Sequence, residues 1–405
     1  MYPFELANFA SISTSLSSGT FILTFDRIKI KSDFLRPFLQ RKGKRMNRAF
    51  NFGAGPATIP TEVLEEAQKE LLDFKGSGIS IMEASHRSKL YEEVHNGAIS
   101  LMRELYEIPD DYEVMFLQGG ASLQFAMIPM NLAMDGKIQY ANTGSWSKKA
   151  IKEVKVQNLD MEIVASSEET SFDRIPEDIV FDDDADYAYI TSNNTIYGTQ
   201  YKTFPSTKAP LVVDASSDIF SYPVDWSKVD MLFAGAQKNA GPSGVTIVIM
   251  KKELLSRVKD SVPTILRYTT HAENNSLYNT PPTFGIYLLN LTMEWIKKQG
   301  GIKAVQKMNE EKAALLYDTI DNSNGFYTGH AQKDSRSLMN VSFNIKDKNA
   351  ELEGKLIKLT EENGMIGLKG HRSIGGLRAS IYNAMSIDGI QALVDLMEKF
   401  AAENQ

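Results

Sequence analysis

Cysteine is absent from the 405-residue chain, so disulfides, thiolate metal sites and cysteine nucleophiles are excluded. No apolar run reaches the roughly 18 residues that would indicate a membrane span. Positive charge is not in excess, because 44 Lys and Arg stand against 51 Asp and Glu, a net charge of −7. That balance argues against a general nucleic-acid binder. No pair among the five histidines has the spacing of zinc ligands, so we expect no metal site.

The composition is typical of a globular protein with a large core. Hydrophobic residues make up 42% of the chain and charged residues 23%, which is ordinary for a soluble protein. A chain of this length is expected to hold two or more domains. No internal repeat or low-complexity tract occurs between residues 46 and 405. We expect a cytoplasmic protein without a membrane or nucleic-acid partner.

The first 45 residues differ from the rest, since they hold eight Lys or Arg against three acids and a Ser- and Thr-rich stretch. Such a composition is typical of an organelle transit peptide, although the acids Glu5, Asp26 and Asp33 weaken that interpretation. The favoured interpretation is a disordered tail, or a start codon assigned too early with Met46 as the true start. We therefore treat residues 1–45 as an N-terminal extension.

The chain is organised around one glycine- and alanine-rich turn that contains Lys238, between the apolar runs 229–233 and 245–250. A lysine held away from water has a lowered pKa and so a larger nucleophilic fraction, which suits a Schiff base. An apolar strand that ends in Asp214 lies upstream. An aspartate and a lysine at neighbouring strand ends suit pyridoxal phosphate, because the carboxylate keeps the pyridine nitrogen protonated. The plainer alternative is a turn lysine and a strand-end aspartate of any α/β protein.

Near-continuous apolar strands alternate with helical patterns through the first 300 residues, which predicts a mostly parallel seven-stranded sheet covered by helices on both faces. In such α/β sheets ligands bind at the carboxyl ends of the strands. Several polar residues are expected at that edge: Ser122, Trp146, Thr195, Asp214, Gln237 and Lys238. Their convergence favours a cofactor site over the plainer interpretation.

We predict a large domain at residues 46–300 and a small α+β domain at residues 301–405. A helix over residues 284–299 ends at Gly300 and Gly301, where we place the boundary. An earlier helix is predicted over residues 61–74. The stretch 266–282 has no apolar period and is expected to be a long loop, either functional or disordered.

Two His-Arg pairs suggest an anionic substrate. His86-Arg87 and His371-Arg372 use two of the five histidines, and Arg378 follows the second pair closely. Arginine binds carboxylates and phosphates through two parallel hydrogen bonds. Each residue alone is more simply a surface salt-bridge residue, but several around one cleft indicate a polyanionic substrate.

The sequence resembles the phosphoserine aminotransferases, which are class-V, fold-type-I pyridoxal-phosphate enzymes, over residues 47–405. The most specific motifs are the Gln-Lys turn followed by Asn-Ala-Gly-Pro and the His-Arg-Ser-Ile-Gly-Gly-Leu-Arg stretch. The matching segments are Gly119-Gly-Ala-Ser122, Trp146, Asn194-Thr195, Val213-Asp214-Ala-Ser-Ser, Ala234-Gly-Ala-Gln-Lys238-Asn-Ala-Gly-Pro-Ser-Gly, Asn279-Thr280-Pro-Pro-Thr and Gly370-His-Arg-Ser-Ile-Gly-Gly-Leu-Arg378.

The resemblance implies a role for each matching residue. Lys238 would hold pyridoxal 5'-phosphate as a Schiff base and shuttle the substrate proton, and Asp214 would pair with the pyridinium nitrogen. Trp146 would stack on the ring, and Thr195 would bond its 3′ oxygen. The cofactor phosphate would be held by Ala121, Ser122 and Gln237, and from the partner subunit of a homodimer by Asn279 and Thr280.

The resemblance also implies the substrates. Arg378 would bind the α-carboxylate, and the side-chain anion pocket would contain His86, Arg87, His371 and Arg372. The reaction would be amino transfer between L-glutamate and 3-phosphohydroxypyruvate, giving O-phospho-L-serine and 2-oxoglutarate in serine biosynthesis. The related four-carbon substrate of pyridoxine biosynthesis is left open. Some members carry an arginine at the position of Ser122, so the number of arginines at the substrate phosphate is also open.

Three alternatives share the fold. A cysteine desulfurase is disfavoured because the chain has no cysteine. A small-acid transaminase of the alanine–glyoxylate type would have no use for so many anion-binding residues. A non-catalytic sensor that binds pyridoxal phosphate is disfavoured by Lys238, Asp214 and Arg378, although fold alone does not decide function.

Overall fold

The computed structural model describes residues 16–17, 20–21, 24–25, 28–29 and 48–404. The chain divides into two units, residues 1–48 and residues 49–405. The prediction that residues 1–45 form a tail or follow a misassigned start lies mostly outside the described residues. The described strands of the first unit form two antiparallel pairs, which are β1 (Leu16–Ser17) with β2 (Thr20–Phe21) and β3 (Thr24–Phe25) with β4 (Ile28–Lys29).

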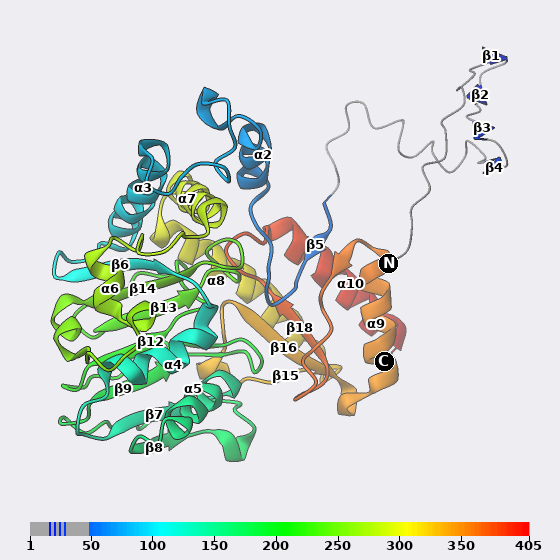
Figure 1. The fold of residues 1–405 in the computed structure, drawn as a ribbon. Coiled ribbons are helices and arrows are strands. Elements are labelled where there is room, and N and C mark those ends of the chain that lie inside the picture. Colours follow the sequence, from blue (N-terminus) through cyan, green and yellow to red (C-terminus); the bar gives the residue numbers. More distant parts are fainter. Residues whose placement is uncertain (1–15, 18–19, 22–23, 26–27, 30–47, 405) are drawn as a thin grey trace, which may run out of the picture. The chain divides into compact units, whose positions relative to one another are not determined.

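A seven-stranded sheet forms the centre of the second unit, in the order β6-β14-β13-β12-β9-β7-β8 (Figure 1). Within this sheet β14 is antiparallel to both neighbours and the remaining pairs are parallel. The predicted mostly parallel α/β sheet is therefore confirmed. The strands are β6 (Tyr112–Leu117), β7 (Ile138–Asn142), β8 (Met161–Ser166), β9 (Tyr187–Thr191), β12 (Leu211–Asp214), β13 (Met231–Gly235) and β14 (Thr246–Lys251).

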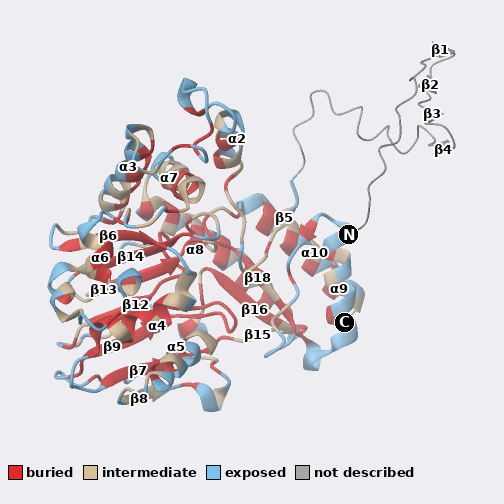
Figure 2. Cartoon of the chain, viewed as in Figure 1, coloured by how far each residue is buried: buried red, intermediate tan, exposed pale blue. Residues whose placement is uncertain are grey.

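Helices cover both faces of this sheet, and its strands are buried except for the edge strand β8, which is half-buried to exposed (Figure 2). Val114 and Phe116 of β6 belong to a core cluster shared with α3 and α7. Met115 and Leu117, which point to the other face, belong to a cluster shared with α4 and α5. The helices around the sheet are α2 (Thr61–Glu70), α3 (Lys89–Tyr106), α4 (Gly120–Leu132), α5 (Ser145–Val156), α6 (Tyr268–Glu273) and α7 (Thr283–Lys298).

The C-terminal part contains a three-stranded antiparallel sheet, β15-β16-β18, with its own core cluster that also takes in Phe52. This separate core is consistent with the small α+β domain predicted from residue 301, and the boundary itself stays a prediction. The elements are α8 (Ile302–Asp321), β15 (Tyr327–Gly329), β16 (Asn340–Ile345), α9 (Ala350–Glu362), β17 (Met365–Ile366), β18 (Leu377–Ser380) and α10 (Ile387–Asn404).

Short elements connect these layers. β5 pairs in parallel with β17, and so joins the entry segment of the second unit to its C-terminal part. Two-residue strands β10 and β11 form a tight antiparallel pair after β9. The remaining elements are β5 (Phe50–Asn51), β10 (Asn193–Asn194), β11 (Thr199–Gln200) and the 3₁₀ turns η2 (Phe74–Gly76), η3 (Glu168–Thr170), η4 (Lys252–Arg257), η5 (Thr264–Leu266), η6 (Lys333–Ser335) and η7 (Lys346–Lys348).

Two local predictions were wrong. The helix predicted over residues 61–74 ends at Glu70. The stretch 266–282, predicted as a loop, contains the helix α6, whose inward residues are Tyr268, Thr270 and His271 rather than aliphatic residues. Tyr268 is anchored to α4, because its hydroxyl donates to Gln124 Oε1 at 2.7 Å. Among the described residues, no helix is long and apolar enough to cross a bilayer.

Candidate active site

Asp214 and Lys238 lie at the same edge of the central sheet. Asp214 is the last residue of β12, which pairs in parallel with β13, and Lys238 lies in the turn that follows β13. The turn is fixed at its two ends, since Ala236 N donates to Val245 O at 3.0 Å and Gly241 N donates to Ala236 O at 2.9 Å. The sheet therefore brings the predicted pair together on rigid backbone.

The Lys238 ammonium lies between an aromatic ring and a hydroxyl. Its Nζ donates to Thr195 Oγ1 at 2.7 Å and lies 4.8 Å from the ring centroid of Trp146. Burial lowers the pKa of Lys238, the Asp214 charge opposes this and the Arg378 charge adds to it, so that the resulting pKa is about 8. Such a lysine holds far more neutral amine near pH 7 than one in water.

Asp214 is a buried carboxylate held by its own turn. Ser216 donates to Asp214 Oδ1 twice, from its backbone N at 3.0 Å and from its hydroxyl at 2.6 Å. Burial raises the pKa of Asp214, and the Ser216 bonds and the Lys238 charge lower it. Because a buried carboxylate is stable when it faces a cation, this position suits a protonated ring nitrogen.

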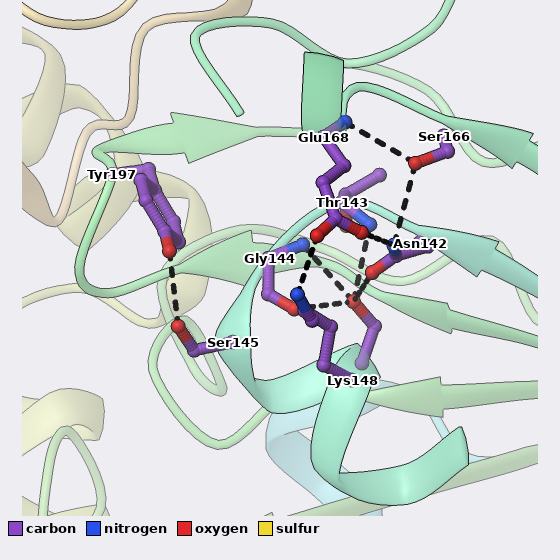
Figure 3. A network of polar contacts seen from close by, with 9 residues as sticks. Asn142, Thr143, Gly144, Ser145, Lys148, Ser166, Glu168 and Tyr197 are labelled. Atoms are coloured by element: carbon purple, nitrogen blue, oxygen red, sulfur yellow. Dashed lines mark hydrogen bonds and ion pairs between the residues drawn. The ribbon is translucent and has the colours of Figure 1, made fainter. Parts of the chain in front are cut away.

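Trp146 lies in the first turn of α5, and a polar network fixes that turn (Figure 3). Ser147 Oγ accepts from the backbone N of Thr143 at 3.1 Å and of Gly144 at 3.0 Å. Lys148 is paired with Glu168 at 2.5 Å, on the side of the helix toward β8. The indole Nε1 of Trp146 is buried and has no hydrogen-bond partner among the described residues. The rigid indole is thus available to a further group.

The predicted phosphate residues lie at the start of α4. Gly119 has φ +84° and an added Cβ would lie 2.6 Å from Leu123 Cβ, so this turn requires glycine. Ala121 and Ser122 follow in the first turn of α4. The free N–H groups of a helix N-terminus bind anions. The segment with Asn279 and Thr280 is close, since Gln118 Nε2 donates to Thr280 O at 3.3 Å.

Gln237 comes directly before Lys238 in the turn after β13, and the entry segment contacts it there. Its carbonyl accepts from Ala57 N at 2.9 Å. An added Cβ on Gly55 would lie 3.0 Å from Lys238 Cγ, so residues 55–57 pack directly against the lysine turn. Sequence analysis missed this contact, because residues 55 and 238 are far apart in the chain.

Arg378 of the C-terminal part acts electrostatically on Lys238, and His371 is near both Arg378 and Arg372. Arg378 Nη1 donates to Thr195 O at 3.5 Å, and its Nε is buried without a partner among the described residues. Partial burial lowers the pKa of His371, and the charges of Arg378 and Arg372 lower it further. Arg372 is exposed. This group of positive charges suits a substrate with more than one anionic group.

The fold does not bring every predicted residue to this cluster. His86 and Arg87 lie between η2 and α3, and in the described part of the chain no hydrogen bond, ion pair or ring contact joins either of them to Lys238, His371 or Arg372. His86 Nε2 is buried without a partner among the described residues, and Arg87 is exposed. The joint anion pocket of the two His-Arg pairs therefore stays a prediction.

Asp218 is a second buried carboxylate that sequence analysis missed. It accepts from Ser192 Oγ at 2.5 Å, Tyr222 OH at 2.9 Å and Gln200 Nε2 at 3.2 Å. Burial raises the pKa of Asp218 to about 6. The only signal in the sequence was its place four residues after Asp214, which is equally typical of a surface loop.

Comparison with known proteins gives one consistent family. The aminotransferase class-V profile matches residues 49–393. A phosphoserine aminotransferase of Campylobacter jejuni subsp. jejuni is 59% identical over 354 residues, which cover 87% of this chain and 98% of that protein. A solved phosphoserine aminotransferase that records radiation damage of its Schiff base is 54% identical with TM-score 0.85, covering 88% of this chain and 99% of the other. The PLP-bound phosphoserine aminotransferase of Trichomonas vaginalis is 38% identical with TM-score 0.83, covering 87% and 100%.

Proposed function

The chain belongs to the class-V aminotransferases, and from this we propose that it is a pyridoxal-phosphate-dependent phosphoserine aminotransferase. It transfers an amino group between L-glutamate and 3-phosphohydroxypyruvate, giving O-phospho-L-serine and 2-oxoglutarate. One observation carries the proposal: a desolvated lysine meets a hydroxyl, an indole and a group of substrate-side cations at the edge where β12 ends in a buried carboxylate.

The residues at this edge fit the cofactor. Lys238 supplies the amine for the aldehyde, Asp214 the carboxylate for the ring nitrogen, and Trp146 a flat surface with an unused donor. Thr195 would bond the ring oxygen, and Ala121, Ser122 and Gln237 would hold the phosphate. When bound, pyridoxal phosphate supplies the electron sink that stabilises negative charge at the substrate Cα.

The remaining steps belong to the chain itself. Arg378 binds the substrate α-carboxylate through its guanidinium and so orients the Cα–H bond toward Lys238. Once the substrate amino group has taken its place on the aldehyde, the freed Lys238 amine would accept the proton from Cα and would return it when the amino group has moved to the cofactor. Asp214 stays ionised against the ring nitrogen, and the Ser216 bonds hold its carboxylate in place.

A homodimer is part of this proposal. Asn279 and Thr280, whose segment contacts Gln118 of its own chain, would then reach the cofactor phosphate of the partner subunit, and His86 and Arg87 would join the partner's anion pocket. Large apolar side chains are exposed on the same two segments, with Leu72 84%, Met82 53% and Tyr278 45% exposed. An exposed apolar surface of this kind is typical of a subunit interface. We also propose a cytoplasmic location.

The alternative small-acid transaminase accounts less well for the charges. Its substrate has one carboxylate, which Arg378 alone satisfies. Arg372 and the nearby His371, whose pKa burial and the charges of Arg378 and Arg372 lower, would then have no anion to bind. The phosphorylated four-carbon acid of pyridoxine synthesis carries a phosphate and a carboxylate, so it is a second candidate substrate for the same residues.

A coupled assay with glutamate and phosphohydroxypyruvate tests the reaction, and borohydride tests the lysine. We expect purified protein loaded with pyridoxal phosphate to be reduced by borohydride with the label on Lys238. Lys238→Ala should keep the circular dichroism spectrum of the wild type and lose turnover. Lys252→Ala changes an exposed lysine and is the control, which should keep turnover. A label on another lysine, or wild-type protein inactive with both substrates, would overturn the proposal.

A further inference from the structure

Two successive lysines of α5, Lys148 and Lys149, have different surroundings. Lys148 pairs with Glu168 at 2.5 Å, as part of the network that fixes the start of the helix (Figure 3). Among the described residues, no hydrogen bond or ion pair involves the Lys149 ammonium. Its Nζ instead lies 4.2 Å from the ring centroid of Trp146, one helical turn earlier. The two side chains therefore leave the helix in different directions, one to a carboxylate and one to the indole.

The position over the indole brings Lys149 to the active site. The same ring has Lys238 Nζ at 4.8 Å, so the two ammonium groups lie around one indole. The charge of Lys149 is also one of the causes that lower the pKa of His371 and of Lys238. Lys149 thus belongs electrostatically to the group of His371, Arg372 and Arg378, although it comes from a different part of the chain.

The simplest alternative is an exposed lysine that covers an aromatic ring, which is common on protein surfaces. The charges around Lys149 argue against that alternative. Its charged neighbours at the site are cations, while Asp214 and Asp218 are buried and hydrogen-bonded within the protein. Cations that converge without a counter-ion repel each other, and a bound anion relieves that repulsion.

We propose that Lys149 is a substrate-binding residue that contacts the side-chain anion of the substrate, opposite His371 and Arg372. The cofactor phosphate is a less suitable partner, because its proposed site is the start of α4 around Ala121 and Ser122. The inference rests on the proposed function for the identity of the anion, a phosphate. Lys149 would favour substrates whose side chain carries two negative charges. It comes from the large part of the fold, whereas His371 and Arg372 come from the C-terminal part.

The test compares Lys149→Met with Lys152→Met, a matched change of an exposed lysine one turn later on the same helix. Single-turnover half-reactions of the cofactor-loaded enzyme are measured with phosphoserine and with alanine. We expect Lys149→Met to lower kcat/KM for phosphoserine about tenfold and to leave alanine within about twofold. Lys149→Arg should recover most of the loss, and Lys152→Met should resemble the wild type.

A second measurement does not depend on turnover. Titration of the cofactor-loaded enzyme with inorganic phosphate, followed by calorimetry, should give a dissociation constant about tenfold weaker for Lys149→Met than for Lys152→Met. If the wild type fails to react with phosphoserine, the proposed function is wrong, and this titration still decides the role of Lys149. Equal phosphate affinity in the two variants, or an equal loss with alanine and phosphoserine, would overturn the inference.

Discussion

At the scale of single residues, burial decides the chemistry of the site. A lysine in water has a pKa of about 10.4, so less than about a thousandth of it is neutral at pH 7. Lys238 has a pKa of about 8, which leaves roughly a tenth of its amine neutral at pH 7. Burial causes this change against the opposing charge of Asp214. The same side chain can therefore attack an aldehyde and carry a proton.

Burial also changes the pKa of Asp218, but it raises this pKa instead of lowering it. The change gives a prediction about stability. Its pKa in the folded protein is about 6, above the ordinary 3.8, because burial disfavours the carboxylate. Between about pH 4 and pH 6 the folded chain therefore holds a proton that the unfolded chain has lost. This contribution to the free energy of unfolding is present below that window and is lost as the pH rises through it. We expect its loss to be about 3 kcal/mol.

The measurement is urea unfolding of the wild type and of Asp218→Asn at about pH 4 and about pH 7. Groups distant from Asp218 titrate alike in the two proteins, so the difference between their free energies of unfolding reports Asp218 together with the groups coupled to it, such as Asp214. We expect the wild type to lose stability relative to Asp218→Asn as the pH rises. A difference that stays constant between the two pH values would show that Asp218 is not desolvated as the structure indicates.

At the scale of elements, one buried lysine joins α8 to the chain after β18. Lys312 is 1% exposed and its Nζ donates to three backbone carbonyls, of Ile381 at 3.0 Å, Tyr382 at 2.8 Å and Met385 at 3.0 Å. Burial lowers the pKa of Lys312 to about 7, whereas the three acceptors match the three donors of an ammonium group. Because β18 carries Arg378, this contact also supports the substrate side of the site.

Lys312→Met keeps an unbranched side chain that is one atom shorter, and it removes all three donors. A buried carbonyl left without a donor costs about 1–3 kcal/mol, and relief from burying a charge offsets part of that cost. We expect a net loss of about 3 kcal/mol or more in the free energy of unfolding, measured in urea. Lys307→Met, an exposed change on the same helix, should stay within about 0.5 kcal/mol of the wild type. Equal stability of the two variants would contradict the role of Lys312.

The elements that sequence predicted best are those with a strong apolar pattern. The apolar run that ends in Asp214 and the run before Lys238 form neighbouring parallel strands, β12 and β13. The helix α6 was missed because its buried face carries Tyr268, Thr270 and His271, which show no aliphatic period. Helix α2 was predicted too long because helical propensity continues to Phe74, where the chain instead enters a 3₁₀ turn.

At the scale of the whole molecule, the family, the fold and the cofactor were predictable because the chemistry is concentrated in short motifs around Lys238 and Arg378. Contacts between residues that are far apart in the chain were less predictable. Asp218 and Lys149 look like surface residues in sequence, and only the fold shows that one is buried and the other lies over Trp146. His86 and Arg87 resemble the second His-Arg pair in sequence, and the joint anion pocket of the two pairs stays a prediction.

The last prediction concerns residues 1–45. Every core cluster among the described residues is built from residues 50 onward, and the family profile matches residues 49–393. All residues assigned to the site lie in the unit of residues 49–405. Deletion of residues 1–45 is therefore expected to leave kcat/KM within about twofold and Tm within about 2 °C of the full chain. Calorimetry gives Tm and the coupled assay gives kcat/KM for both proteins. A protein that lacks only residues 1–20 is prepared in the same way as a control. A Tm lowered by several degrees only in the longer deletion would show that residues 21–45 stabilise the enzyme and that its core extends beyond the matched family region.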